Sequence, residues 1–261
     1  MNQSQNNSDA HVSAVYTYPV KGLNGTSLEQ ANLRPGATIK WDRSFAICLG
    51  NAEFDPENPV FMPKTKFLNL ARHEKLATLE VQFDADSGIL TIFRDGKQVA
   101  RGKLLERIGR QMLEQFFAAY MADDMLGSPH ILHGNRHSFS DVPEKCLSLI
   151  NLASVRDLER VIGRPVDPLR FRGNVYIEGL EPWAELQWKG KDIWIGEEVQ
   201  LGGLDPIGRC AATNINLETA NRDLNIPQTL MQAFGHSDCG IYAEVISGGK
   251  LSAGDTIKVR L

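Results

Sequence analysis

Long apolar runs are absent from this sequence, and none approaches the length needed for a membrane-spanning helix. The start, MNQSQNNSDAHVS, also lacks the basic and apolar regions of a secretory signal peptide. We therefore expect a cytoplasmic protein that does not bind membranes. Residues 1–10 are polar and are expected to form a disordered leader.

Cysteine is scarce, and no two cysteines form a CxxC pair. That absence gives no support to a zinc site or to a thioredoxin-like motif. In a reducing compartment the thiols are expected to be free. The cysteines are Cys48, Cys146, Cys210 and Cys239.

A strong excess of charge of either sign is also missing. The 261 residues carry a formal net charge of -4, and 42% of them are hydrophobic. Mild acidity argues against a general nucleic-acid binder, although a single basic pocket remains compatible with it. The composition is that of an ordinary globular protein able to bury a core.

The first half of the chain has mostly the pattern of β-strands. Residues 11–20 and 43–50 are β-rich, and residues 77–104 predict three strands with turns at 86–88 and at Asp95-Gly96. Residues 103–122 then change to helical spacing, which predicts an amphipathic helix packed on the sheets. The apolar positions that recur at this spacing are Leu105, Ile108, Met112, Phe116 and Tyr120.

The second half combines short strands with two helices. Residues 151–165 predict a helix that Asn151 caps and Gly163 ends, and residues 226–235 predict a shorter one. The many short strands and frequent glycines indicate closed or nearly closed β-barrels. We therefore predict a mainly β fold with a few helices (α+β class). It would have a β-barrel-like domain over 11–128 and a second β-barrel over 129–261.

Several motifs occur together in a characteristic order. They are YPVKG (18–22), WDRSF (41–45), RFRGNVYIEG (170–179), IWIGEEVQLGGLDPIGRCAATNINLETA (193–220) and DCGIYAEVISGGKLSAGDTIKV (238–259). In the second half, the Arg-x-Asn, Arg-Cys and Gly-Gly-x-x-x-x-Gly-Asp elements resemble the MOSC family, which is related to the C-terminal domain of molybdenum-cofactor sulfurase. The front half resembles the β-barrel domain that precedes MOSC in the mitochondrial amidoxime-reducing component and its bacterial relatives.

Cys210, in the segment IGRCAATNIN, is open to three interpretations from its surroundings: a buried filler, a nucleophile or a metal ligand. The resemblance implies the third, with Cys210 as the ligand of molybdenum, because this metal accepts soft sulfur donors. Arg209 would favour the thiolate if the segment turns at this point. The cofactor implied is the molybdenum cofactor (molybdopterin).

The phosphate of that cofactor requires cations and amide donors. The resemblance implies that Lys21, Arg43, Arg172 and Asn174 contact the cofactor, and Lys64 and Lys66 are weaker candidates. If residues 170–174 are extended, Arg170, Arg172 and Asn174 share one face, with Arg170 interpreted as an ordinary surface charge.

The chain departs from the family pattern at two places. Relatives usually have Ser-Cys after the lysine of YPVK, whereas this chain has Gly22-Leu23, so that only the backbone N–H of Gly22 can serve the phosphate. Many relatives have Thr-Thr-Val-Asp-Pro after the cysteine, whereas this chain continues through Ala212 to Asn216 without an aspartate.

Two further clusters have less favoured functional interpretations. Cys239 lies near His236 and Asp238, which permits a nucleophile set, although polar loop chemistry is the more common explanation. His130, His133 and His137 have spacing compatible with a metal site, but no carboxylate or cysteine pattern supports one.

The resemblance implies a molybdenum-cofactor oxidoreductase that reduces N-hydroxylated small molecules by two electrons. No ferredoxin-type cysteine cluster is present, so we expect a separate electron-donor protein. Two alternatives remain: a carrier of persulfide sulfur on Cys210, and a non-catalytic protein that binds or carries the cofactor.

Overall fold

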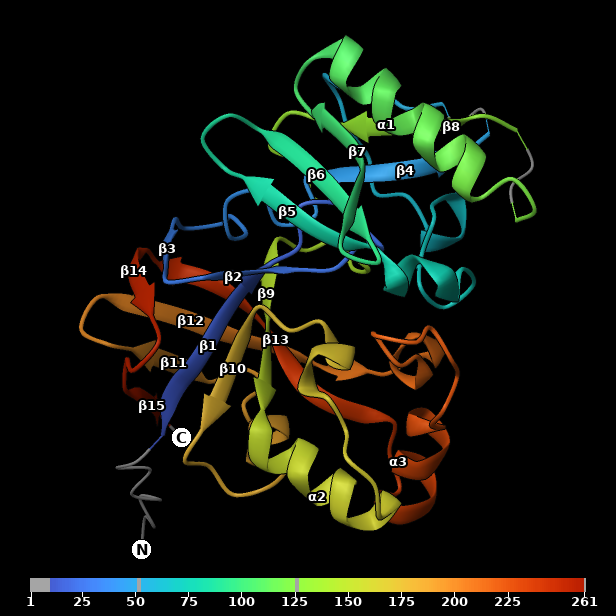
Figure 1. Ribbon diagram of the computed structural model, residues 1–261. Helices are drawn as coiled ribbons and strands as arrows, with labels where there is room; N and C mark the ends of the chain where they lie inside the picture. Colours follow the sequence, from blue (N-terminus) through green and yellow to red (C-terminus); the bar gives the residue numbers. More distant parts are fainter. Residues whose placement is uncertain (1–9, 51–52, 125–126, 261) are drawn as a thin grey trace, which may run out of the picture.

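The computed structural model describes residues 10–50, 53–124 and 127–260. Two lobes lie one above the other in Figure 1. The upper lobe carries helix α1 (Arg107–Tyr120), and the lower lobe carries α2 (Leu152–Ile162) and α3 (Ile226–Phe234). No helix in the described ranges is long and apolar enough to cross a membrane.

The lower lobe is built on an eight-stranded sheet. Its strands, in spatial order, are β15 (Ile257–Arg260), β11 (Asp192–Ile195), β12 (Val199–Gly208), β13 (Asp238–Ser247), β9 (Cys146–Asn151), β10 (Val175–Glu178), β1 (His11–Thr17) and β2 (Thr26–Leu28). Helix α2 connects the parallel neighbours β9 and β10. The edge strands β2 and β15 do not pair with each other, but a bridge from His11 to Thr256 curls the sheet towards closure.

Strand β1 crosses the predicted domain boundary. It pairs antiparallel with β10, so the beginning of the chain is an inner strand of the second half's sheet. Likewise β3 (Gln30–Leu33) pairs with β14 (Gly249–Ser252). Of the predicted leader, residues 1–9 lie outside the described residues, and Ala10 is buried in the core of this sheet.

The upper lobe contains the predicted three-stranded meander. Its strands are β5 (Glu80–Asp84), β6 (Ile89–Arg94) and β7 (Lys97–Lys103), and a separate pair is formed by β4 (Phe45–Leu49) and β8 (Pro129–His133). Both predicted turns are confirmed, because they join β5 to β6 and β6 to β7. Together with α1 these strands enclose a second hydrophobic core, separate from that of the large sheet.

Helix α1 is present, but the predicted buried face is wrong for three of its five residues. Leu105, Ile108 and Met112 are exposed, whereas Leu113 and Phe117 are fully buried. The helix approaches β7 most closely at Gly109, where a Cβ atom would lie 2.3 Å from the backbone of Lys103. This close contact sets the rotation of the helix and turns the predicted stripe partly towards solvent.

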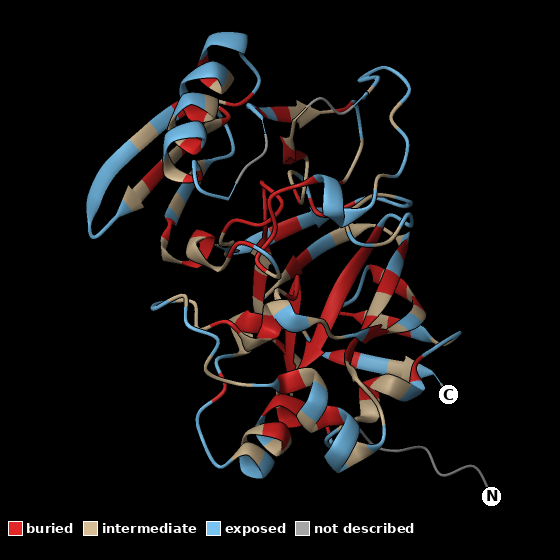
Figure 2. Ribbon diagram, turned by 90° about the vertical axis from the view of Figure 1, so that its right-hand side faces the viewer, coloured by how far each residue is buried: buried red, intermediate tan, exposed pale blue. Residues whose placement is uncertain are grey.

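The end signals of the other two helices are confirmed. The Asn151 side chain accepts a hydrogen bond from the N–H of Ala153, and Gly163 ends α2 in the left-handed conformation. Gly235 ends α3 in the same way. Short 3₁₀ helices occupy several loops: η1 (Lys64–Lys66), η2 (Glu74–Thr78), η3 (Pro168–Phe171), η4 (Ala184–Gln187) and η5 (Ala211–Asn214). Figure 2 shows that buried segments continue from one lobe into the other.

Candidate functional site

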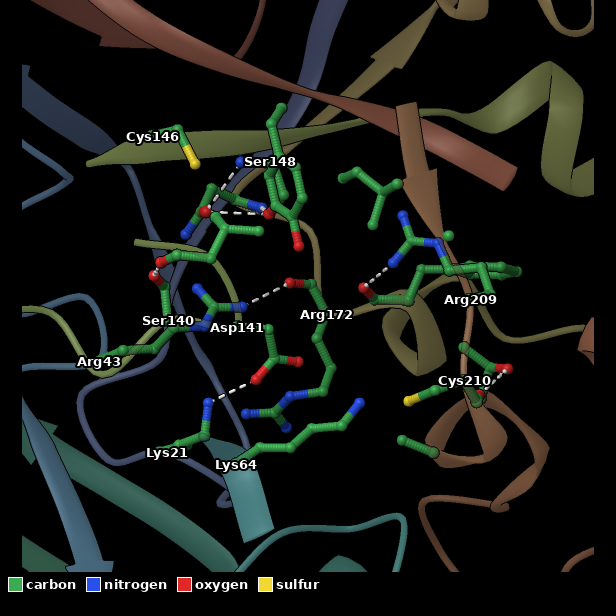
Figure 3. Close-up of a pocket in the computed structure, with 18 of the residues that line it drawn as sticks. Lys21, Arg43, Lys64, Ser140, Asp141, Cys146, Ser148, Arg172, Arg209 and Cys210 are labelled. Carbon is green, nitrogen blue, oxygen red and sulfur yellow. Dashed lines mark hydrogen bonds and ion pairs between the residues drawn. The ribbon is translucent and has the colours of Figure 1, made fainter. Parts of the chain in front are cut away.

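A cavity of about 510 Å³ is lined by loops from both lobes. These loops follow β1, precede β4, connect β8 to β9, and flank η3 and η5. Figure 3 shows the side chains that converge on it. All the residues selected from the sequence as site residues line this cavity: Lys21, Gly22, Arg43, Arg172, Asn174, Arg209 and Cys210.

Cys210 lies between the end of β12 and the start of η5, in an extended backbone conformation. Its side chain is half-buried, and Figure 3 shows the sulfur within the cavity. The other cysteines are buried, and burial raises the pKa of Cys146 and of Cys239 to about 12. Cys210 is therefore the accessible thiol among the described residues.

Two arginines pack against one aromatic ring beside the cavity. The guanidinium carbons of Arg43 and Arg172 lie 4.9 and 4.5 Å from the centroid of the Tyr18 ring. Both arginines have left-handed backbones, with φ values of 51° and 53°, which non-glycine residues adopt at a cost of about 1–3 kcal/mol. Such strain persists only where the surroundings fix it, so the fold holds two like charges close together.

The two arginines differ in how their charge is balanced. Arg43 donates to Asp42 at 2.6 Å and to the backbone oxygen of Arg172 at 3.0 Å. The guanidinium of Arg172 donates no hydrogen bond to any described residue. Burial lowers the pKa of Arg172 below its ordinary value. The carboxylates of Asp141 and Asp42 balance its charge only in part, so an anion entering the cavity would find free donors on this guanidinium.

Lys21 is buried and already has partners. Its ammonium donates to Asp141 at 2.5 Å and to the backbone oxygen of Phe139 at 2.7 Å. Burial lowers the pKa of Lys21, and the charge of Asp141 opposes that effect. Lys21 thus reaches the cavity from one lobe and holds the loop between β8 and β9 in place.

Arg209 and Asn174 line the cavity with side chains whose polar atoms are engaged elsewhere. Arg209 donates to the backbone oxygens of Phe171 and Cys239, so it braces the wall around the cavity, away from the thiol of its neighbour. Asn174 accepts from the N–H and hydroxyl of Ser148 and donates to Asp42. Its amide therefore orients the carboxylate that pairs with Arg43.

Position 22 requires glycine, both for its backbone conformation and for the lack of space around it. It has φ of +88°, and a Cβ atom there would lie 2.7 Å from the backbone oxygen of Leu68. The serine found at this point in relatives would not fit this chain without a shift of that backbone.

We expect Gly22→Ser to destabilise the protein by about 1–3 kcal/mol, from left-handed strain and the clash together. Gly36→Ser is the matched control, because Gly36 has φ of +64° and a Cβ atom there would meet no other atom within 4 Å. Urea denaturation would measure both. Equal losses for the two variants would show that the Leu68 contact is unimportant.

The segment around Arg170 corrects the sequence analysis. Residues 168–171 form η3 and Arg172 is left-handed, so 170–174 is not an extended strand with one shared face. Arg170 is not a surface charge: it is 4% exposed and donates to both carboxylate oxygens of Asp223, at 2.7 and 3.0 Å. This ion pair anchors η3, and with it the backbone that carries Arg172.

The other candidates are placed as follows. Lys64 lines the cavity, whereas Lys66 does not. Asn216 is also outside the cavity lining: its side-chain oxygen accepts from the N–H groups of Glu218 and Thr219 in a turn. The missing aspartate at this point therefore removes no group from the cavity wall.

Neither of the two less favoured clusters forms a site. Cys239 is fully buried within a hydrophobic core, and the His236 ring accepts from the N–H of Asp238 and packs on Trp183. The described residues contain no group of three potential ligands that could hold a metal ion, so His130, His133 and His137 do not converge.

The cavity fits a ligand that combines a soft metal with a phosphate. An accessible thiol supplies a soft donor, and the unpartnered guanidinium of Arg172 supplies donors for an oxyanion. Sequence reasoning did not identify Asp42, Tyr18 or Asp141, which orient or neutralise the cations. Tyr18 and Asp42 each precede a selected cation within a recognised motif, and Asp141 has no such signal.

Comparisons with known proteins agree with the resemblance. A profile of the MOSC N-terminal beta barrel domain matches residues 9–125, and a profile of the MOSC domain matches residues 134–258. Molybdenum cofactor sulfurase from Arabidopsis thaliana is 27% identical over 167 residues, which are 59% of this chain. The match spans 20% of that protein's length.

Two solved structures share weaker similarity with the chain. The YuaD protein from Bacillus subtilis is 12% identical with a TM-score of 0.45, covering 96% of this chain and 94% of that one. YiiM from Geobacillus stearothermophilus is 17% identical with a TM-score of 0.35, covering 44% of this chain and 54% of that one.

Proposed function

Because the chain belongs to the MOSC domain family, with a MOSC N-terminal beta barrel domain over its first half, we propose that it binds the molybdenum cofactor and acts as an oxidoreductase. The substrates proposed are N-hydroxylated small molecules such as amidoximes. A separate protein would deliver the electrons.

The observation that carries this proposal is the pairing of two features in one cavity. The accessible thiol of Cys210 lines the same cavity as the Arg43–Arg172 pair, and these residues come from distant parts of the chain. A buried filler cysteine would need no such accessibility. A phosphate site alone would need no thiol.

Each residue has a defined task in this proposal. Cys210 would bind the metal as a thiolate. Arg172 and Arg43, held in position by the Tyr18 ring, would donate to the phosphate together with Lys21. Asn174 would keep Asp42, and through it Arg43, in the required orientation. When bound, the cofactor would supply the two-electron redox chemistry, which the protein positions and tunes.

Metal analysis tests the proposal directly. Protein purified from a host that makes the cofactor is expected to contain molybdenum and pterin close to one equivalent each, measured by mass spectrometry. The loaded protein is expected to reduce benzamidoxime with a chemical electron donor. Absence of both metal and pterin would refute the cofactor claim, and a loaded protein without turnover would refute the reductase claim.

The persulfide alternative has a different signature in the same preparation. An accessible Cys210 would also suit a carrier of sulfane sulfur. Sulfane sulfur on Cys210 without molybdenum would favour that function over the reductase.

A further inference from the structure

The carboxylate of Asp141 lies among the cations of the cavity, in addition to that of Asp42, which pairs with Arg43. Asp141 accepts from Lys21 at 2.5 Å, and its side chain is half exposed while that of Lys21 is 7% exposed. Burial opposes ionisation of Asp141, but the charges of Lys21, Lys64 and Arg43 lower its pKa below the ordinary value. Figure 3 shows this carboxylate between Lys21 and Arg172.

The segment that carries Asp141 contributes much of one cavity wall. Residues 134–145 connect β8 to β9 without a helix or strand of their own. Ser140, Val142 and Glu144 from this segment also line the cavity. Lys21 holds the segment through two bonds, one to Asp141 and one to the backbone oxygen of Phe139.

We propose that Asp141 is a tethered anion that occupies the position of a phosphate monoester and competes with it for Lys21. The inference rests on the proposed function, because it assigns a regulator to the phosphate end of the same cavity. In the ligand-free protein the carboxylate neutralises Lys21. Binding of the phosphate displaces the carboxylate and moves residues 140–142 away from the cavity.

The charges in the cavity explain why the two anions exclude each other. Asp42 already neutralises Arg43, which leaves Lys21, Lys64 and Arg172 to share Asp141. The Lys21 ammonium has three N–H donors, and Phe139 and Asp141 already accept from two of them, so a phosphate that used more than the one remaining donor would have to displace Asp141. Two anions at one ammonium repel each other strongly, because they lie only a few ångströms apart.

The Asp141→Asn variant tests this competition with inorganic phosphate as the probe. The whole 261-residue chain, made in a host that lacks the cofactor, is titrated by calorimetry at constant ionic strength. The amide can still accept from Lys21, but it carries no charge. We expect phosphate to bind about tenfold more tightly than to the wild type, since one repulsive charge is removed. Asp205→Asn is the matched control. Asp205 also lines the cavity, but it forms an exposed ion pair with Lys189. We expect this variant to bind phosphate with nearly the affinity of the wild type.

The inference would be overturned if Asp141→Asn bound phosphate no more tightly than the wild type. Equal gains in affinity for Asp141→Asn and Asp205→Asn would also overturn it, and so would the absence of phosphate binding in all three proteins. Thermal unfolding without phosphate checks that each variant is folded, and Asp141→Ser serves as the second variant if the amide does not fold. The titration uses protein made without the cofactor, so its result is independent of the metal analysis. The competition can be disproved even if protein from a cofactor-producing host contains molybdenum and pterin. Conversely, absence of the cofactor in the metal analysis leaves the phosphate result intact.

Discussion

Cys210→Ala is expected to lose essentially all bound molybdenum in a host that makes the cofactor, while its thermal stability stays within about 1 °C of the wild type when both are made without the cofactor. The loss follows because the variant lacks the accessible thiol of the cavity. Stability is retained because the Cys210 side chain is half-buried and lies outside the hydrophobic cores. Deleting side-chain atoms at such a position has only a small effect on the free energy of unfolding. Mass spectrometry of metal content and a thermal unfolding curve measure the two effects.

Cys146→Ala is the matched control for this prediction. Cys146 lines the same cavity but is 6% exposed, and burial raises its pKa to about 12. We expect this variant to keep its metal and to be slightly less stable. Unchanged metal content in Cys210→Ala would show that the assignment of the thiol is wrong, whatever the control does.

Asp223→Ala is expected to have the largest effect on stability. It removes the counterion of Arg170, whose side chain is only 4% exposed and whose charge would be left buried without a partner. An uncompensated buried charge of this kind destabilises a protein by about 3–5 kcal/mol. Urea denaturation at neutral pH measures the loss, and reduced metal retention should accompany it because η3 precedes Arg172.

A double-variant cycle separates this effect from simple loss of packing. Arg170→Met removes the buried charge itself, so combining it with Asp223→Ala should recover part of the stability lost in Asp223→Ala alone. A double variant less stable than either single one would contradict the ion-pair explanation.

The same ion pair predicts a dependence on acid pH. The hydrogen bond from Arg170 lowers the pKa of Asp223 in the folded protein. The stabilisation that the ionised Asp223 provides is therefore fully present above the ordinary aspartate pKa of about 3.9. It is lost as the pH falls through the lower pKa that Asp223 has in the folded protein. The stability difference between the wild type and Asp223→Ala should accordingly shrink in strong acid.

Elements with strong local signals could be predicted from the sequence. The turn at Asp95-Gly96 and the caps of α2 have local causes, namely a left-handed turn and a side chain that accepts a backbone N–H. The buried face of α1 could not be predicted, because it depends on the contact between Gly109 and β7, and a helical period does not specify which of two adjacent apolar stripes meets the sheet.

The candidate site could likewise be predicted from the sequence only in part. The family motifs located the residues that line one cavity, while what these residues bind remains a prediction. The roles of individual side chains depended on partners distant in sequence: Asp141 for Lys21, Asp223 for Arg170, and backbone oxygens for Arg209. A spacing of two residues suggested that Arg170 and Arg172 share a face, but η3 separates them.

The position of β1 has a consequence for how the protein can be divided and made. A fragment starting at residue 129 would expose the edge of β10 and lack the apolar side chains of Val12 and Val15, so it should aggregate instead of folding alone. During synthesis β1 leaves the ribosome more than a hundred residues before β10 does. Strand β2 follows soon afterwards and pairs with one edge of β1, but the edge that pairs with β10 has to remain uncovered, or be shielded by a chaperone, until most of the chain has emerged.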